Sequence, residues 1–296
     1  MNMRNGILIL VLSVLAVSCT KKDVGAVSFD VTTSSTTYNV GDSVVFNFSG
    51  NPDYIVYYSG ENGHQYQYRN RTKAQGTPYL NFLTYLQFGT HPNTLRLLLS
   101  TDFSGSYDTV GIRNATWTDI TSKAILSTGK DSTFSGNISL AEYNHPDTPI
   151  YVAFKFADKQ DGVVSQRTWT IRNLSLINKL QDSSSSTLLD IPNSIWLGVN
   201  FLNPAVLWTI SNASLRISGG NLTAPSNEDW VISQPVNLGE VNPDTGVAIK
   251  TLTAPVLKSY YHIYTKPGNY TVVFDAVNAN STSRTEGQKT INITVQ

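Results

Sequence analysis

Cysteine is nearly absent from this chain of 296 residues, in which Cys19 is the only one. A single thiol cannot form an intramolecular disulfide, the cross-link on which many small secreted domains depend. Hydrophobic residues make up 40% of the sequence, which is enough for well-packed cores. The stability of the protein is therefore expected to come from the packing of its secondary structure.

Charged residues are also scarce. They make up 14% of the chain, whereas typical soluble domains contain about 25%. The 21 basic and 21 acidic residues cancel to a formal net charge of zero. Surfaces that bind nucleic acids or anionic membranes need an excess of basic residues, which this chain lacks. We therefore expect no nucleic-acid partner.

The apolar run near the start of the chain is short. Residues 7–17 are apolar except for Ser13, and Arg4 precedes them. A membrane-spanning helix needs about 20 apolar residues, so this run is too short to be one. Its length and the basic residue before it are typical of the apolar region of an export signal.

Cys19 comes directly after this run and is preceded by the small residues Ala16 and Ser18. This arrangement looks like a lipoprotein signal peptide over residues 1–18, cleaved before a lipidated Cys19. Residues 19–26 would then form a short polar tether. An ordinary signal peptide with an incidental cysteine is the alternative.

Motifs for catalysis are missing as well. The chain contains no Gly-x-Ser-x-Gly nucleophile elbow, and its histidines lack the spacing of zinc ligands. Glycoside hydrolysis requires two carboxylates at a defined separation, and no motif pairs the acidic residues of this chain. We expect no catalytic residue, no enzymatic activity and no metal centre. A glycoside hydrolase is the least favoured of the functional classes.

A structural calcium ion bound by aspartates is the only cofactor that the sequence suggests. Two pairs could bind the ion through carboxylate oxygens: Asp102 with Asp108, and Asp158 with Asp161. Capping of loops by these side chains is the role that we favour. No other cofactor is expected.

Alternation of apolar and polar residues is the main structural signal. In residues 264–278, a Pro-Gly turn is followed by a strand in which Tyr270 and Val272 share one face and Thr271 and Val273 the other. Residues 41–50 and 290–295 alternate in the same way. The sequence contains no convincing helix, so the expected fold class is all-β.

Two short motifs connect the start and the end of the chain. They are Tyr-Asn-Val-Gly-Asp at 38–42 and Pro-Gly-Asn-Tyr-Thr-Val at 267–272. This pair is similar to the PKD-like, immunoglobulin-type sandwich of bacterial surface proteins, in which the first motif leads into an early strand and the second opens a late one. The resemblance implies a split β-sandwich formed by residues 27–75 and 255–296.

The residues between these motifs show short alternating segments separated by turns. Examples are Ser-Thr-Asp-Phe-Ser-Gly at 100–105, Thr-Trp-Thr-Asp at 116–119 and Thr-Trp-Thr-Ile at 168–171. Such spacing favours a sandwich or jelly roll. The series resembles the jelly-roll modules attached to bacterial glycan-active proteins and implies an inserted jelly-roll domain over residues 90–250.

A longer composite pattern suggests a family. It joins residues 41–50 to Tyr-Tyr-Ser-Gly-Glu-Asn-Gly-His-Gln-Tyr-Gln-Tyr-Arg-Asn-Arg at 57–71. This pattern resembles the N-terminal part of a family of Bacteroidetes surface lipoproteins that carries a domain of unknown function and is linked to polysaccharide-utilisation systems.

The resemblance implies a non-catalytic lipoprotein of the outer membrane that faces the cell surface and binds a polysaccharide or oligosaccharide. Its expected partner is an outer-membrane glycan importer complex, and the lipid anchor would be its only contact with the membrane. A structural or adhesive surface lipoprotein that binds protein partners is the alternative.

Exposed aromatic rings are the usual platforms for sugars, because their apolar faces cover sugar C–H groups. Trp196 and Trp208 lie near the turn-rich stretch 200–204 and are better candidates for exposure than the other three tryptophans. Tyr66 and Tyr68 flank Gln67 and would share one face of a strand. These four aromatic residues are the candidate ligand-binding residues, with a packed sheet face as the alternative for the two tyrosines.

Overall fold

The computed structural model describes residues 24–296. The expected signal peptide, the lipidation site Cys19 and tether residues 19–23 lie outside the described residues. Strands dominate the described part and several sheets pack face to face, which confirms the all-β fold class. The exceptions within residues 24–296 are a short helix, α2 (Thr109–Asn114), and three 3₁₀ turns. The expectation that no helix occurs was therefore wrong at α2, which Asp108 caps by accepting bonds from two backbone N–H groups.

The chain divides into two compact units. Within the described residues, the split unit consists of residues 24–69 together with Asp244–Gln296, and the central unit of Asn70–Pro243. These limits differ from the expected 27–75, 90–250 and 255–296. The central unit begins 20 residues earlier than expected, at Asn70 and not at 90. Val247–Lys250, expected in the inserted domain, pairs with a strand of the split unit.

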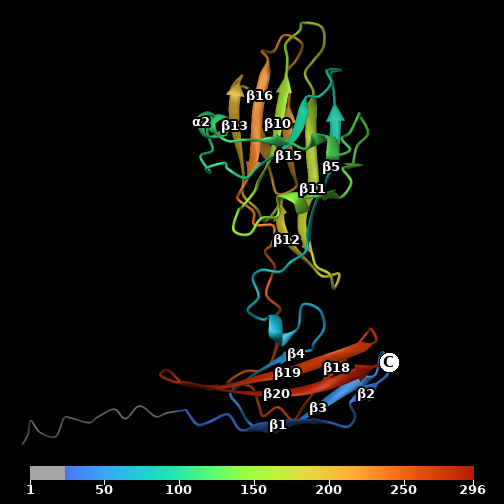
Figure 1. The fold of residues 1–296 in the computed structure, drawn as a ribbon, viewed down its shortest axis with the longest axis vertical. Coiled ribbons are helices and arrows are strands. Elements are labelled where there is room, and N and C mark those ends of the chain that lie inside the picture. The colour runs from blue at the N-terminus through green and yellow to red at the C-terminus, as the bar shows by residue number, and fades with distance from the viewer. Residues whose placement is uncertain (1–23) are drawn as a thin grey trace, which may run out of the picture. The chain divides into compact units, whose positions relative to one another are not determined.

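The split unit contains two sheets, in which the first and last strands of the chain take part together (Figure 1). One sheet has the order β1 (Phe29–Thr33), β3 (Ser43–Gly50), β18 (Ser259–Ile263). The other has the order β17 (Val247–Lys250), β4 (Tyr54–Tyr58), β19 (Gly268–Ala279), β20 (Arg284–Val295), β2 (Thr37–Tyr38). β2 runs parallel to β20, and the other pairs are antiparallel.

The core of the split unit lies between these two sheets and is rich in aromatic rings. Phe46 on β3 contacts Phe274 on β19 edge to face, with ring centroids 5.1 Å apart. Tyr57 on β4 lies 5.9 Å from Phe46 and 5.4 Å from Phe274. Side chains from residues 41–50 and 264–278 thus meet in one core, because strand alternation turns their apolar faces inward.

The central unit contains two larger sheets (Figure 1). The first has the order β13 (Trp196–Leu202), β16 (Asn227–Ser233), β10 (Tyr151–Asp158), β6 (Leu95–Ser100), β7 (Thr118–Asp119). The second has the order β14 (Thr209–Ile210), β15 (Ser214–Ser218), β11 (Thr168–Lys179), β5 (Thr77–Gln87), β8 (Thr133–Phe134). Two further strands, β12 (Ser185–Asp190) and β9 (Ile138–Ser139), pair with β11 and β5.

Aliphatic side chains fill most of the core of the central unit. Leu80 and Ile171 come from one sheet and Leu97 and Val231 from the other, and each is at most 1% exposed. Most of these residues alternate with polar ones along their strands, as the period of two requires. β10 is buried at nearly every position, as expected for the middle strand of a sheet with apolar residues on both faces.

Candidate functional site

The outer face of β19 and β20 forms the floor of a pocket in the split unit. The inward residues of β19, Val272 and Phe274, are fully buried, so Thr271 and Val273 point outward between them. On β20 the outward positions include Gln288 and Thr290, and Thr290 pairs directly with Val273. The sheet thus presents hydroxyl and amide groups around the side chain of Val273.

A loop at 59–69 forms the opposite side of the pocket. It turns at Gly60, whose N–H donates to the carbonyl oxygen of His64 at 3.0 Å. The backbone of Gly60 has a φ of +82°, and a Cβ there would lie 2.8 Å from the backbone nitrogen and oxygen of Thr271. Only glycine fits this close approach of the loop to β19 without strain.

The loop is fixed by the first residues of the C-terminal part of the split unit, Asp244 and Thr245. The side chain of Asp244 accepts a bond from the N–H of Gln65 at 2.9 Å, and the carbonyl of Thr245 lies 2.6 Å from Nδ1 of His64. The N–H of Thr245 donates to the carbonyl of Gly63 at 2.9 Å. These bonds order the wall of the pocket before any ligand arrives, which lowers the entropic cost of binding.

Tyr66 is the aromatic residue of the wall. Its ring meets that of Tyr58 edge to face at 5.2 Å, and the guanidinium carbon of Arg69 lies 3.8 Å from its centroid. Burial, with the nearby carboxylate of Asp275 as a second cause, raises the pKa of the Tyr66 phenol. The hydroxyl therefore stays neutral in physiological conditions and can both donate and accept a hydrogen bond.

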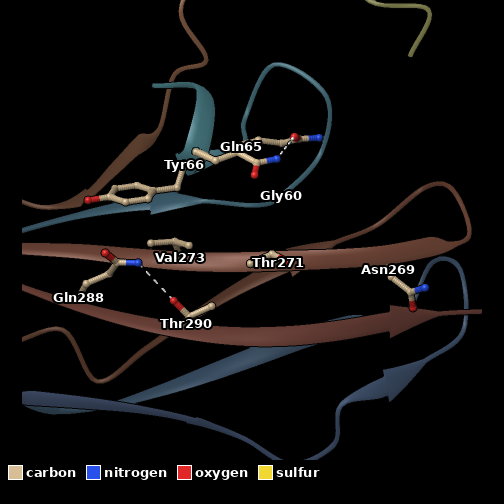
Figure 2. A pocket seen from close by; sticks show the side chains of 9 residues that line it. Gly60, Gln65, Tyr66, Asn269, Thr271, Val273, Gln288 and Thr290 are labelled. Carbon is tan, nitrogen blue, oxygen red and sulfur yellow. Dashed lines mark hydrogen bonds between the residues drawn. The ribbon is translucent and has the colours of Figure 1, made fainter. Parts of the chain in front are cut away.

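The pocket enclosed by the sheet and the loop has a volume of about 340 Å³ (Figure 2). Its lining comprises Gly60, Gln65, Tyr66, Gln67, Asn269, Thr271, Val273, Gln288 and Thr290. None of these side chains is charged. Two bonds between lining residues order it further: Gln67 Nε2 donates to Gln65 Oε1 at 3.1 Å, and Gln288 Nε2 donates to Thr290 Oγ1 at 3.3 Å.

This chemistry suits a neutral ligand with many hydroxyl groups. Amides and hydroxyls offer both donors and acceptors, whereas a charged ligand would need a countercharge in the lining. The volume is at the lower end of the range of about 300 to 1,000 Å³ that is usual for small-molecule sites.

The two predicted tyrosines have different positions. Tyr66 lines the pocket, whereas Tyr68 is not part of its lining. The expectation that they share one face of a strand was wrong, because residues Tyr66–Tyr68 form a 3₁₀ turn. With three residues per turn, side chains two positions apart point in different directions.

The two predicted tryptophans are buried in the central unit. Trp196 is 5% exposed and Trp208 is 8% exposed, and both belong to its main core. Trp196 begins β13 and donates from Nε1 to the carbonyl of Asp190 at 2.9 Å. The expectation that they are the more exposed tryptophans was wrong. Trp196 lies on β13, whose pairing with β16 turns its ring inward, and Trp208, directly before β14, packs into the same core. Neither offers a ring face to a ligand.

The amide and hydroxyl residues of the pocket were not among the residues predicted from the sequence to bind a ligand. Alternation along β19 and β20 already assigned Thr271 and Thr290 to the polar face, which is a usable signal. No local pattern predicted that the loop at 59–69 would cover this face of the sheet. The residues that fix the loop, Asp244 and Thr245, are about 180 positions further along the chain.

The aspartates proposed for calcium act as hydrogen-bond acceptors. Asp108 accepts from the N–H groups of Val110 and Gly111, and Asp102 from the N–H of Thr116 at 2.8 Å. Asp158 and Asp161 accept from the two ring nitrogens of His91. Within residues 24–296, no group of three or more His, Cys, Asp or Glu side chains is arranged to hold a metal ion. Among the same residues, no helix has the length and apolarity needed to cross a membrane.

The fold and the pocket define an all-β protein of two sandwich units with a neutral, polar cavity in one of them. Comparison with known families adds a match over residues 18–196 to DUF5017, a domain of unknown function. The chain belongs to this family, whose model covers the first strands of the split unit and much of the central unit. Searches of curated proteins and of solved structures gave no match.

Proposed function

We propose that this protein is a non-catalytic, lipid-anchored glycan-binding protein of the outer membrane, and that the pocket on β19 and β20 holds the glycan. The observation that carries the proposal is the lining of this pocket, which combines amides, hydroxyls and Tyr66 with no charge. Neutral polysaccharides and oligosaccharides have the complementary chemistry, with many hydroxyl groups and apolar ring faces.

The resemblance of residues 41–71 to surface lipoproteins of polysaccharide-utilisation systems supports the same proposal. In such a system, the protein would capture a glycan chain near an outer-membrane importer. The anchor is assigned to Cys19. Cys19→Ser would move the protein from the membrane fraction to the soluble fraction, with Ser18→Ala as the matched control that stays membrane-bound. A wild-type protein without an attached lipid by mass spectrometry would contradict the anchor.

The direct test is binding of the purified protein to an array of plant, fungal and host glycans. Tyr66→Ala and Gln288→Ala remove the ring and one amide of the pocket. Each is expected to weaken binding at least about tenfold, because a lost contact of about 1.4 kcal/mol corresponds to that factor. Tyr261→Ala is the matched control, since Tyr261 is 63% exposed on β18, in the other sheet.

Thermal melting of each variant separates loss of binding from loss of folding. If Tyr66→Ala and Gln288→Ala melt as the wild type does and bind as well, the pocket is not the glycan site. Release of reducing sugar from any bound glycan would contradict the non-catalytic part of the proposal.

A structural or adhesive role with protein partners is the second candidate. It is favoured by apolar side chains on the outer face of β3 and β18, where Val45, Tyr261 and Ile263 are between 39% and 63% exposed. Failure to bind any glycan, together with a protein partner that Tyr261→Ser releases, would move the assignment to this role.

A further inference from the structure

Oxygen atoms converge in the central unit where β13 ends beside the start of β16. The two strands pair at Asn200 with Asp229 and at Leu202 with Glu228, and the register shifts between these pairs. Asn227 and Asp229 at the start of β16 are 2% and 1% exposed. Buried polar groups of this kind need hydrogen-bond partners or a counterion.

The orientation of the Asn227 amide is set by Gln166. Gln166 Nε2 donates to the carbonyl of Pro225 at 2.8 Å, and Gln166 Oε1 accepts from the N–H of Gly220 at 3.1 Å. These two bonds fix which end of Gln166 faces Asn227. Asn227 Nδ2 donates to that oxygen at 3.1 Å, so its own Oδ1 must point the other way.

Asn227 Oδ1 then faces only other oxygens. Asp229 Oδ2 and the carbonyl oxygen of Leu202 are its neighbours, each 3.2 Å away. Turning the amide by 180° would satisfy these two acceptors but would place Oδ1 against Gln166 Oε1. In either orientation of the Asn227 amide, an oxygen atom on one side is left without a hydrogen-bond donor. The missing donor is therefore a property of the surrounding residues and not of how the amide is oriented.

A second amide nearby has too many acceptors. Asn200 Nδ2 lies 2.7 Å from Asp229 Oδ1 and 2.9, 3.1 and 3.2 Å from the carbonyl oxygens of Leu202, Asn203 and Val206. An amide nitrogen carries two hydrogens and can satisfy two of these four oxygens. The carbonyl of Asn203 also accepts from the N–H of Val206 at 3.1 Å. The neighbourhood therefore has a surplus of acceptors on both sides of Asp229.

We propose that this oxygen cluster binds a calcium ion. The cluster consists of Asn227 Oδ1, Asp229 Oδ2 and the carbonyl oxygen of Leu202. The other oxygens nearby surround Asn200 Nδ2, which already donates to them. Calcium takes six to eight oxygen ligands, accepts carbonyl, carboxamide and carboxylate groups together, and tolerates irregular geometry. The direct ligands that we assign are Asn227 Oδ1 and the two oxygens that it faces, Asp229 Oδ2 and the carbonyl oxygen of Leu202.

Magnesium fits the cluster less well. It requires near-octahedral geometry and keeps several of its waters, whereas these oxygens come from buried side chains and a tight loop at 202–206. Glu228 adds no second carboxylate, because its side chain is occupied by Lys155 at 2.9 Å and by the Trp230 indole. A single carboxylate among neutral oxygens implies moderate affinity, as in extracellular calcium sites.

A proton is the competing occupant of the cluster. Burial raises the pKa of Asp229 to about 7, so a protonated carboxyl group could donate to one of the facing oxygens below that pH. The experiment is therefore made at pH 8, where a proton is no longer held and a calcium ion would be.

The test uses the purified protein after treatment with a chelator and dialysis. Addition of excess CaCl₂ is expected to raise the melting temperature of the central unit by roughly 5 to 10 °C, as follows for a ligand at about 100 times its dissociation constant. One calcium ion per chain should be retained in elemental analysis, and MgCl₂ or NaCl at the same ionic strength should have a smaller effect. The absence of both the shift and bound calcium overturns the proposal.

Two variants and one control locate the site. Asp229→Asn is expected to weaken calcium binding at least about tenfold, whereas Asn227→Asp adds a charge and should strengthen it by a similar factor. The control, Asp158→Asn, alters another buried carboxylate of the same unit, which accepts from the N–H groups of Arg167 and Lys159.

The control should lower stability without changing the response to calcium. If Asp229→Asn does not fold, Asn227→Asp decides the question by titration calorimetry. Unchanged affinity in Asn227→Asp, or loss of the calcium response in Asp158→Asn, overturns the assignment.

Discussion

The split unit and the central unit are both β-sandwiches, but their strands come from different parts of the chain. In the split unit, β4 pairs with β19 and β3 with β18, so each of these pairs joins residues about 200 positions apart. In the central unit all strands come from one continuous segment, Asn70–Pro243. Aromatic rings make up a larger share of the core in the split unit than of the main core in the central unit.

This difference indicates how each unit depends on the chain. When strands far apart in the sequence pair, the chain loses conformational entropy before the contacts that offset this loss have formed. The split unit therefore needs its C-terminal strands to complete its core, whereas all strands of the central unit lie in one continuous segment. The large aromatic side chains of the split unit each bury much apolar area, which helps a small core to offset the entropic cost.

The largest effect is expected from removing β20. A chain that ends after Ala279 loses the strand that pairs with both β19 and β2, together with the buried side chains of Ile293 and Val295. Hydrogen exchange should then show loss of protection in β1–β4, while β5–β16 remain protected. Protection of β1–β4 in the truncated chain would contradict the dependence of the split unit on its C-terminal strands.

Matched substitutions in the two cores should act separately. Phe274→Ala in the split unit and Phe154→Ala in the central unit each remove a fully buried ring, at a cost of about 3 to 5 kcal/mol. In denaturant unfolding followed by hydrogen exchange, each variant should destabilise its own unit only. An equal loss in both units from either substitution would show that they unfold as one.

A smaller effect is expected from pH, and only in the central unit. Hydrogen bonds to Asp161 and then to Asp158 raise the pKa of His91, whose ring nitrogens lie 2.6 and 2.5 Å from the two carboxylates. A raised pKa in the folded state means that the stabilisation is full below the unfolded value of about 6.5. It is lost as the pH rises through the folded value.

The measurement for this pH effect is the melting temperature of the central unit from pH 6 to 9. It should fall across this range in the wild type and fall less in His91→Gln, which keeps a hydrogen-bonding side chain without the charge. His145→Gln is the control at another histidine of the same unit. A wild-type profile with the same slope as His91→Gln would contradict the role of the imidazolium.

The smallest effects are expected at exposed ion pairs. Lys289 and Asp30 in the split unit are 3.1 Å apart, as are Arg96 and Asp119 in the central unit, and each side chain is at least 40% exposed. Such pairs contribute about 0 to 1 kcal/mol. Lys289→Ala and Arg96→Ala should therefore change the unfolding free energy by less than about 1 kcal/mol. A larger change in either would show that the pair is more than a solvated contact.

Much of the strand structure could be predicted from local patterns. Alternation in residues 264–278 correctly separated Val272 and Phe274, which are buried, from the outward Thr271. The same rule failed at Tyr66 and Tyr68, where two glycines and bonds to Asp244 and Thr245 form a turn in place of a strand. It also gave no basis for the exposure of Trp196 and Trp208, because a nearby turn does not set the direction of a side chain.

The sequence by itself determined the all-β class and the faces of most strands, because side-chain alternation in a strand is a local property with a period of two. The joining of the two chain ends was implied only by the resemblance of two motifs. Only the tertiary structure decided the pocket and the oxygen cluster. The pocket combines Gln65 with Gln288, and the cluster combines Leu202 with Asn227 and Asp229. Such groups meet through strand pairing and loop placement, which depend on the free energy of the whole fold and leave no mark in any short stretch of sequence.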